Sequence, residues 1–213
     1  GLWIASSANC AGATVFGVFS PWTDLNGTEN LAQAGADGIK VQYVPADDRA
    51  EAWGVASVYA GNSGRYATRT AQTINGTNYF VVYAVNAYLD GTAAQTFLQF
   101  DAGKRKLYVP ASSTVLRWTD LPNGGGGGAD ISTATYGPTG SMDNWAVCSI
   151  WRDTSTNVHM AINADAELTS ATCNDSSGSG GAMQIGPGAA TTGYGTTPYI
   201  STWSSDPGET ILK

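Results

Sequence analysis

The chain has 213 residues, a formal net charge of −7 at pH 7 and charged side chains at only 13% of its positions. This length fits one all-β domain, and 42% hydrophobic residues are enough for a packed core, which excludes a disordered protein. An acidic surface repels phosphate backbones and anionic lipid, so we expect neither nucleic acid nor a membrane as a partner.

Residues 1–38 are predicted to form an N-terminal extension that is only partly strand. Thr14–Phe19 is an apolar strand pattern, and Leu31–Ala34 fits a single helical turn that Gly35 stops. Because an irregular arm must bury its apolar surface somewhere, we expect Leu2–Ile4 to pack against a neighbouring subunit. The alternative is that the arm adds edge strands to its own sandwich.

From residue 39 to residue 213 the chain is a series of short strand patterns separated by turn residues. Ile39–Val44 alternates apolar and polar residues, as a half-buried strand does, whereas Tyr79–Val85 is apolar on both faces and fits a central strand. Further strands are expected at Ala52–Ala60, Thr96–Phe100, Lys106–Val109 and Thr114–Trp118. Strands at this spacing predict a β-sandwich, with the extension and the sandwich forming a single domain overall.

The last third of the chain adds Asn144–Arg152, a polar turn, Asn157–Asn163, Met183–Gly186 and a closing strand at Tyr199–Glu209. This order resembles the laminin-G-like and concanavalin A-like lectin and glucanase jelly rolls, mainly over residues 39–212. The resemblance implies an all-β fold, a concanavalin-type jelly-roll β-sandwich of two antiparallel sheets, which is mostly a binding or packing scaffold and only sometimes an enzyme. Asn163-Ala164 stands where that family usually has an Asn-Gly turn, so the resemblance implies the fold more than a sugar or calcium site.

The period of two along these strands also predicts which residues form the core. The predicted core residues are Val81, Val85, Val147, Ile162 and Ile185. Trp145 and Trp151 lie on the same face of one strand as Val147, and we interpret that stripe as part of the core.

No catalytic constellation is apparent, so we expect no enzyme activity and assign no catalytic residue. Retaining glucan cleavage needs two carboxylates about 5–5.5 Å apart, which places them on one strand face. None of Glu29, Glu51, Glu167 and Glu209 pairs with another acid in that way. A lone histidine such as His159 is more often a hydrogen-bonded structural residue than a base.

We also expect no metal site and no cofactor. One histidine cannot form a multi-histidine zinc site, and Cys10, Cys148 and Cys173 lack ligand spacing. Cys148 and Cys173 are expected on strands as buried thiols, with the disulfide state left open. Calcium is conceivable, but the scattered aspartates are typical turn formers and make no local motif.

Four aromatic residues near loops are candidates for carbohydrate binding, because sugar rings stack on exposed aromatic faces. They are Trp22, Trp118, Tyr136 and Tyr194. Aromatic residues at strand ends also simply cap a sandwich, and the sequence does not separate these two interpretations.

The function that we predict is non-enzymatic and structural or adhesive, with a bacteriophage virion component (capsid decoration, fibre or tail-associated) as its first form. This predicts a virion or extracellular location, with other protein subunits as partners and surface glycans as further ones. The alternatives are a secreted, lectin-like carbohydrate-binding module and, third, a polysaccharide-degrading enzyme.

Overall fold

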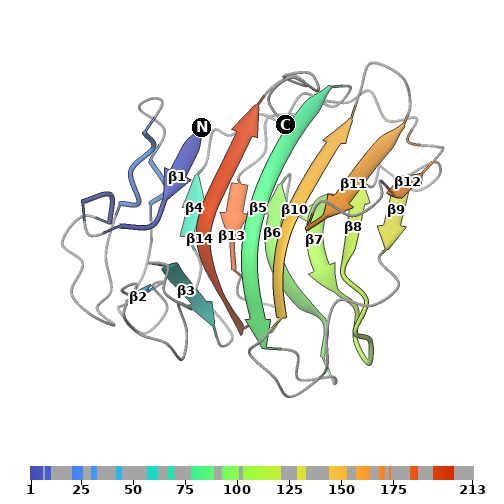
Figure 1. Cartoon of the computed structure of the whole chain (residues 1–213), viewed down its shortest axis with the longest axis horizontal. Coiled ribbons are helices and arrows are strands. Elements are labelled where there is room, and N and C mark those ends of the chain that lie inside the picture. The colour runs from blue at the N-terminus through green and yellow to red at the C-terminus, as the bar shows by residue number, and fades with distance from the viewer. Residues whose placement is uncertain are drawn as a thin grey trace.

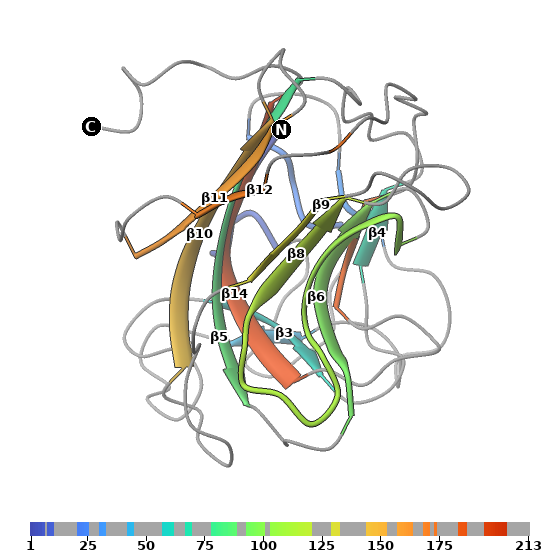
Figure 2. The same ribbon diagram turned by 90° about the vertical axis from the view of Figure 1, so that its right-hand side faces the viewer.

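The computed structural model describes residues 1–6, 8–10, 21–25, 30–32, 42–44, 57–61, 67–69, 78–88, 93–100, 103–120, 129–132, 144–152, 157–163, 168–170, 173, 183–186 and 194–203. These residues form two antiparallel sheets that face each other, so the predicted all-β sandwich is confirmed. Figure 1 shows the larger sheet in front, and Figure 2 shows the two sheets as separate layers.

The larger sheet has eight strands, and β5 (Tyr79–Tyr88) lies near its middle. In spatial order its strands are β12 (Leu168–Ser170), β11 (Val158–Ile162), β10 (Asn144–Arg152), β5, β14 (Tyr194–Trp203), β3 (Ser57–Gly61) and β2 (Gln42–Val44), with β1 (Leu2–Ile4) also pairing with β14. The chain therefore places β5 between two strands from its last third. The register of β14 against β5 shifts between Thr196 and Tyr199, around Pro198, which lacks the N–H that a regular ladder needs.

The smaller sheet has six strands and covers one side of the larger sheet. In spatial order they are β4 (Ala67–Arg69), β13 (Met183–Ile185), β6 (Gln95–Phe100), β7 (Arg105–Val109), β8 (Arg117–Asp120) and β9 (Ala129–Ser132). The strand expected at Thr114–Trp118 begins later, at Arg117, since the Ser113 hydroxyl accepts the N–H of Val115 in the preceding turn. The Asn144–Arg152 strand has the bounds that the sequence predicts.

The core lies between the two sheets and is made by the inward-facing residues of both. Val81 and Val85 of β5 are fully buried in it, as is Ile185 of β13, so these three core predictions are confirmed. Ile162 is only partly buried and packs against the core edge. Tyr83 also links the layers, because its hydroxyl donates to the carbonyl oxygen of Phe97 on β6 at 3.2 Å.

A buried charge cluster joins the sheets at one end of the core. Asp120 of β8 lies 2.9 Å from Arg105 Nε of β7, and its other oxygen lies 3.9 Å from Arg152 Nη1 of β10. All three side chains are at most 3% exposed. Tyr79 of β5 donates its hydroxyl proton to Asp120 Oδ2 at 2.8 Å. Two strands of each sheet therefore meet at one carboxylate.

Two neighbours complete this cluster. Arg152 Nη2 donates to the carbonyl oxygen of Cys173 at 2.6 Å, and Trp118 Nε1 donates to the Tyr79 hydroxyl at 3.2 Å. Burial raises the pKa of Tyr79 well above its usual value, and the adjacent Asp120 carboxylate raises it further. Tyr79 therefore stays protonated and keeps its hydrogen bond to Asp120 at all ordinary pH values.

The N-terminal strand belongs to the larger sheet of its own chain. β1 pairs antiparallel with β14, and Trp3 is fully buried in the common core. The expectation that Leu2–Ile4 needs a neighbouring subunit is therefore wrong for Trp3, the largest apolar group in that segment. The helical turn expected from Leu31 is also wrong at its start, since Leu31 bridges to Trp22 and Ala32 bridges to Thr68. Thr14–Phe19 lies outside the described residues.

We predict that Asp120→Asn destabilises the fold by roughly 3–5 kcal/mol, because it leaves two buried guanidinium groups without their shared counter-charge. The measurement is the free energy of unfolding from urea titration. Lys106→Gln is the matched control, since it removes a charge from the half-buried, opposite face of β7 and is expected to change stability by less than about 1 kcal/mol. Equal losses in both variants would contradict the cluster's role.

Candidate functional site

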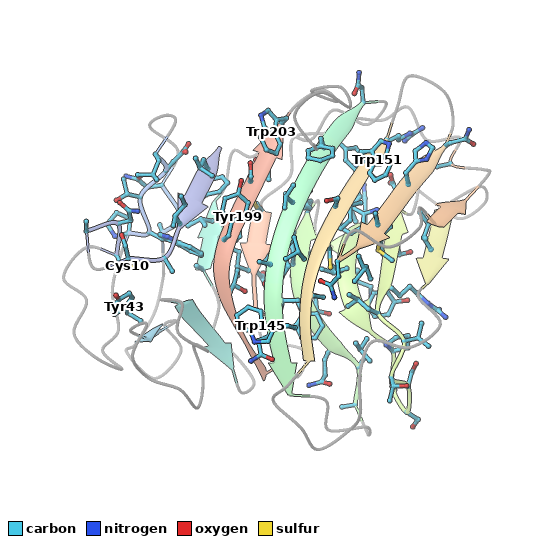
Figure 3. All side chains as sticks on the ribbon, in the orientation of Figure 1. Cys10, Tyr43, Trp145, Trp151, Tyr199 and Trp203 are labelled. Atoms are coloured by element: carbon cyan, nitrogen blue, oxygen red, sulfur yellow. The ribbon has the colours of Figure 1, made fainter. Side chains whose placement is uncertain are left out.

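The central strand β10 turns its tryptophans away from the core. Ala146, Cys148 and Ile150 are fully buried, whereas Val147 is 46% exposed. Trp145 and Trp151, which alternate with the buried residues, are half-buried on the side of Val147. The interpretation of this stripe as core, and of Val147 as a core residue, is therefore wrong. We call this side of the larger sheet the outer face; Figure 3 views it from the front.

The reason for this orientation is the last residue of the strand. Both faces of β10 carry apolar residues, so hydrophobic alternation alone does not choose between them. Arg152 shares its face with Ala146, Cys148 and Ile150, and only that face brings its guanidinium to the buried Asp120. The bulkier stripe is left on the outer face.

An aromatic row crosses four strands of the outer face. Trp203 of β14, Phe80 of β5, Trp151 of β10 and His159 of β11 are successive cross-strand partners. Ring centroids are 5.2 Å apart for Phe80–Trp203 and 6.3 Å apart for Phe80–Trp151. Trp151 and His159 stack nearly parallel, with centroids 5.0 Å apart. Cross-strand aromatic pairs of this kind stabilise a sheet and fix the rings in place.

Trp145 stands away from this row, toward the other end of β10 (Figure 3). Asn163, at the end of β11, holds the backbone there: its Oδ1 accepts the N–H of Val147 at 2.8 Å and its Nδ2 donates to the Trp145 carbonyl oxygen at 3.4 Å. Asn163 adopts a φ of 51°, which asparagine tolerates better than most residues. This turn therefore fixes the backbone that carries the Trp145 ring.

Small side chains fill the middle of the outer face. Val82, Ala84 and Ser201 lie between the aromatic row and Trp145, and Tyr199 of β14 stands directly beside Ala84. Tyr199 and Val82 are half-buried, as are Trp145, Trp151 and Trp203. The outer face thus presents aromatic rings around a centre of small residues, an arrangement that suits flat, partly apolar ligands.

Among the described side chains of the outer face, two polar ones are buried and have no hydrogen-bond partner. Asn86 of β5 is 0% exposed, and neither its Oδ1 nor its Nδ2 is bonded. Ser201 of β14 is 1% exposed, and its hydroxyl is also unbonded. Asn86 is the cross-strand partner of Trp145 on one side and Thr196 on the other. Buried unpaired groups are rare in folded proteins and call for an explanation.

Two of the four aromatic residues singled out in the sequence lie in the core and not on the outer face. Trp22 and Trp118 are both 0% exposed, and Trp22 Nε1 donates to the carbonyl oxygen of Ile4 at 3.1 Å. Neither ring has a face open to a sugar, so the prediction that they are exposed is wrong. Tyr194 is the first residue of β14, two residues before Thr196. Tyr136 lies outside the described residues.

The buried thiols are packing groups. Cys10, Cys148 and Cys173 form no disulfide and are fully buried, with Cys173 beside the charge cluster rather than on a strand. Burial raises the pKa of Cys148 to about 12 and that of Cys10 to about 11, so both stay protonated at neutral pH.

Within the described ranges, no group of three or more His, Cys, Asp or Glu side chains is placed to hold a metal ion. The absence of a metal site or cofactor, calcium included, stays a prediction. In the same part of the protein, no helix combines the length and apolar character needed to cross a membrane.

The fold is similar to binding domains of bacterial toxins. The binding domain of Paraclostridial Mosquitocidal Protein 1 matches 92% of this chain and 50% of its own, with a TM-score of 0.64 and 12% identity. The binding domain of botulinum neurotoxin DC, in complex with SialylT, matches 92% and 50%, with a TM-score of 0.62 and 12% identity. That of botulinum neurotoxin serotype G matches 86% and 47%, with a TM-score of 0.59 and 13% identity. The chain thus spans about half the length of these domains.

At such identities the similarity concerns the fold alone, and it supports the predicted β-sandwich. The sequence matches no protein-family model and no curated protein. These three structures are binding domains and say nothing of a laminin-G-like family or a virion role, so the laminin-G-like family, the jelly-roll order and the virion role stay predictions.

We predict opposite outcomes for the same substitution on neighbouring strands. Val85→Asp buries an unpaired carboxylate in the core at a cost of several kcal/mol, roughly, and should unfold the domain. Val147→Asp places the carboxylate on the outer face and should cost less than about 1 kcal/mol. Thermal melts by circular dichroism measure both. A Val147→Asp protein that is as unstable as Val85→Asp would contradict the assignment of faces.

Proposed function

We propose that this chain is a non-enzymatic carbohydrate-binding module whose ligand contacts the outer face of the larger sheet. The observation that carries the proposal is the set of half-buried aromatic side chains on that face, contributed by β10 and β14 (Figure 3). They are Trp145, Trp151, Tyr199 and Trp203. Sugar rings present one apolar face, and rigid aromatic rings bury it at a low cost in side-chain entropy.

Trp145 and Tyr199 are the rings that we assign to direct contact. The aromatic row is already stacked on itself: Trp151 faces His159, and Phe80 lies between Trp151 and Trp203. Its rings therefore serve mainly to hold the sheet rigid. Trp145 and Tyr199 take part in none of these ring pairs and flank the small residues at the centre of the face.

The similar structures support a binding role. Three of them are binding domains of toxins, and one of these is in complex with SialylT. A sialylated saccharide is therefore a reasonable first ligand to test. The proposal includes an extracellular location, because surface glycans are found there, and a jelly-roll sandwich as the scaffold.

A second candidate is a structural role in which the outer face contacts another protein subunit, with a bacteriophage virion component as its most specific form. Val147 favours it, because a residue 46% exposed on the same face as Trp145 and Trp151 adds to an apolar patch of the kind that marks association sites. Saccharide binding that depends on Trp145 separates the two candidates.

The experiment is a binding titration with glucose, cellobiose, cellotetraose, lactose and sialyllactose, followed by tryptophan fluorescence and isothermal calorimetry. We predict that the wild-type protein binds at least one of them and that Trp145→Ala or Tyr199→Ala weakens binding roughly tenfold, which corresponds to about 1.4 kcal/mol of lost stacking.

Tyr108→Ala is the matched control, because Tyr108 is a half-buried aromatic residue on β7 of the smaller sheet, where Lys106 Nζ lies 4.4 Å from its ring centroid. This variant should bind like the wild type. Binding that survives both outer-face substitutions and disappears with Tyr108→Ala would move the site to the other sheet.

A further inference from the structure

The outer face carries two polar groups that the folded chain leaves unused. Asn86 and Ser201 are buried, and the amide of the first and the hydroxyl of the second make no hydrogen bond. Both belong to the outer face, because Asn86 alternates with the core residue Val85 and Ser201 alternates with the core residue Ile200. A buried amide that makes no hydrogen bond destabilises the folded state. A protein with an apolar residue of similar shape at that position is therefore expected to be more stable.

The two groups lie on neighbouring strands and far apart along them. Ser201 is the cross-strand partner of Val82, and Asn86 is four residues further along β5. At the usual rise of a strand, that separation is about 13 Å. Tyr199 and Ala84 form the cross-strand pair between the two groups, and Trp145 is the partner of Asn86 on β10. A line from Ser201 to Asn86 therefore passes Tyr199 and ends beside Trp145.

From this arrangement we infer that Asn86 and Ser201 are the hydrogen-bonding groups of the saccharide site, and that its ligand is a linear oligosaccharide lying along β5 and β14. The inference rests on the proposed function. One sugar ring is too short to reach both groups, whereas a chain of several rings reaches both and stacks on Tyr199 and Trp145 between and beside them.

The chemistry of the two side chains fits sugar hydroxyls. The asparagine amide offers an acceptor and two donor hydrogens, and the serine hydroxyl both donates and accepts. Each sugar hydroxyl also donates and accepts, so both groups become satisfied when the ligand binds. Both groups are covered in the free protein, so the ligand reaches them only when Trp145 and Tyr199, which lie outside the stacked row, shift aside.

The inference predicts that stability and binding change in opposite directions. Asn86→Leu replaces an unbonded buried amide by an apolar side chain of similar size, so the melting temperature should rise by about 2–4 °C. The same variant should bind cellotetraose and sialyllactose at least tenfold more weakly. Ser201→Ala should show the same pattern with a smaller rise. A purely structural asparagine would instead lower the melting temperature when replaced.

Ser149→Ala is the matched control, because Ser149 lies on the same face, opposite Val82, is half-buried and is not among the unbonded groups. It should leave binding unchanged. The side-chain amide signals of Asn86 should also shift in the NMR spectrum when oligosaccharide is added, but not with glucose at the same sugar concentration.

The outcomes separate this inference from the proposed function. Binding that is lost in Trp145→Ala but unchanged in Asn86→Leu overturns the inference and leaves the proposed function standing. Glucose binding as tightly as cellotetraose overturns the requirement for a chain of rings. A wild-type protein that binds none of the saccharides overturns the proposed function, and the inference fails with it.

Discussion

The rest of the structure depends on the interactions of one buried group, the carboxylate of Asp120. It receives Arg105 from its own sheet and Arg152 and Tyr79 from the other. A buried ion pair adds little stability over well-packed apolar residues, but it tolerates only one arrangement, because misplacing any partner leaves an unpaired charge in the core. In this protein the cluster fixes which face of β10 points inward, and so which residues form the outer face.

That orientation explains why the two faces of the larger sheet carry different kinds of side chain. The inner face of β10 carries small and medium-sized apolar residues that fit between the sheets, with Arg152 at the end. The outer face carries the larger rings. Part of that surface, the row from Trp203 to His159, is occupied by ring–ring contacts, and the part around Trp145 and Tyr199 takes no share in them. The unbonded Asn86 and Ser201 lie in that same part.

Much of this fold could be predicted from the sequence. The strand at Asn144–Arg152, the start of the strand at Tyr79 and the burial of Val81, Val85 and Ile185 follow from short apolar runs that are bounded by turn residues and have to be covered. Asn163 of the Asn163-Ala164 turn adopts a left-handed conformation and bonds the Val147 backbone, whereas Ala164, the departure from an Asn-Gly turn, lies outside the described residues.

The site was harder to predict, for physical reasons. Both faces of β10 are apolar, so the choice of core face depended on a long-range pairing between Arg152 and Asp120 that no local pattern contains. A lone arginine ending an apolar strand was the signal that could have drawn attention to it. Trp118 was assigned to the surface because it ends a strand, yet its indole donates to Tyr79 within the core. The packing of the N-terminal arm could not be predicted for a similar reason, since Trp3 is covered by strands of its own chain that are distant in sequence.

The most direct test of this account is the solvent accessibility of the individual indole groups, measured by NMR as the broadening of each tryptophan Nε1–H signal by a soluble paramagnetic probe. The account predicts broadening for the tryptophans of the outer face and none for those of the core. The outer set is Trp145, Trp151 and Trp203, and the core set is Trp3, Trp22 and Trp118. Protection of Trp145 and Trp151 equal to that of Trp118 would place the stripe inside the sandwich and contradict the account.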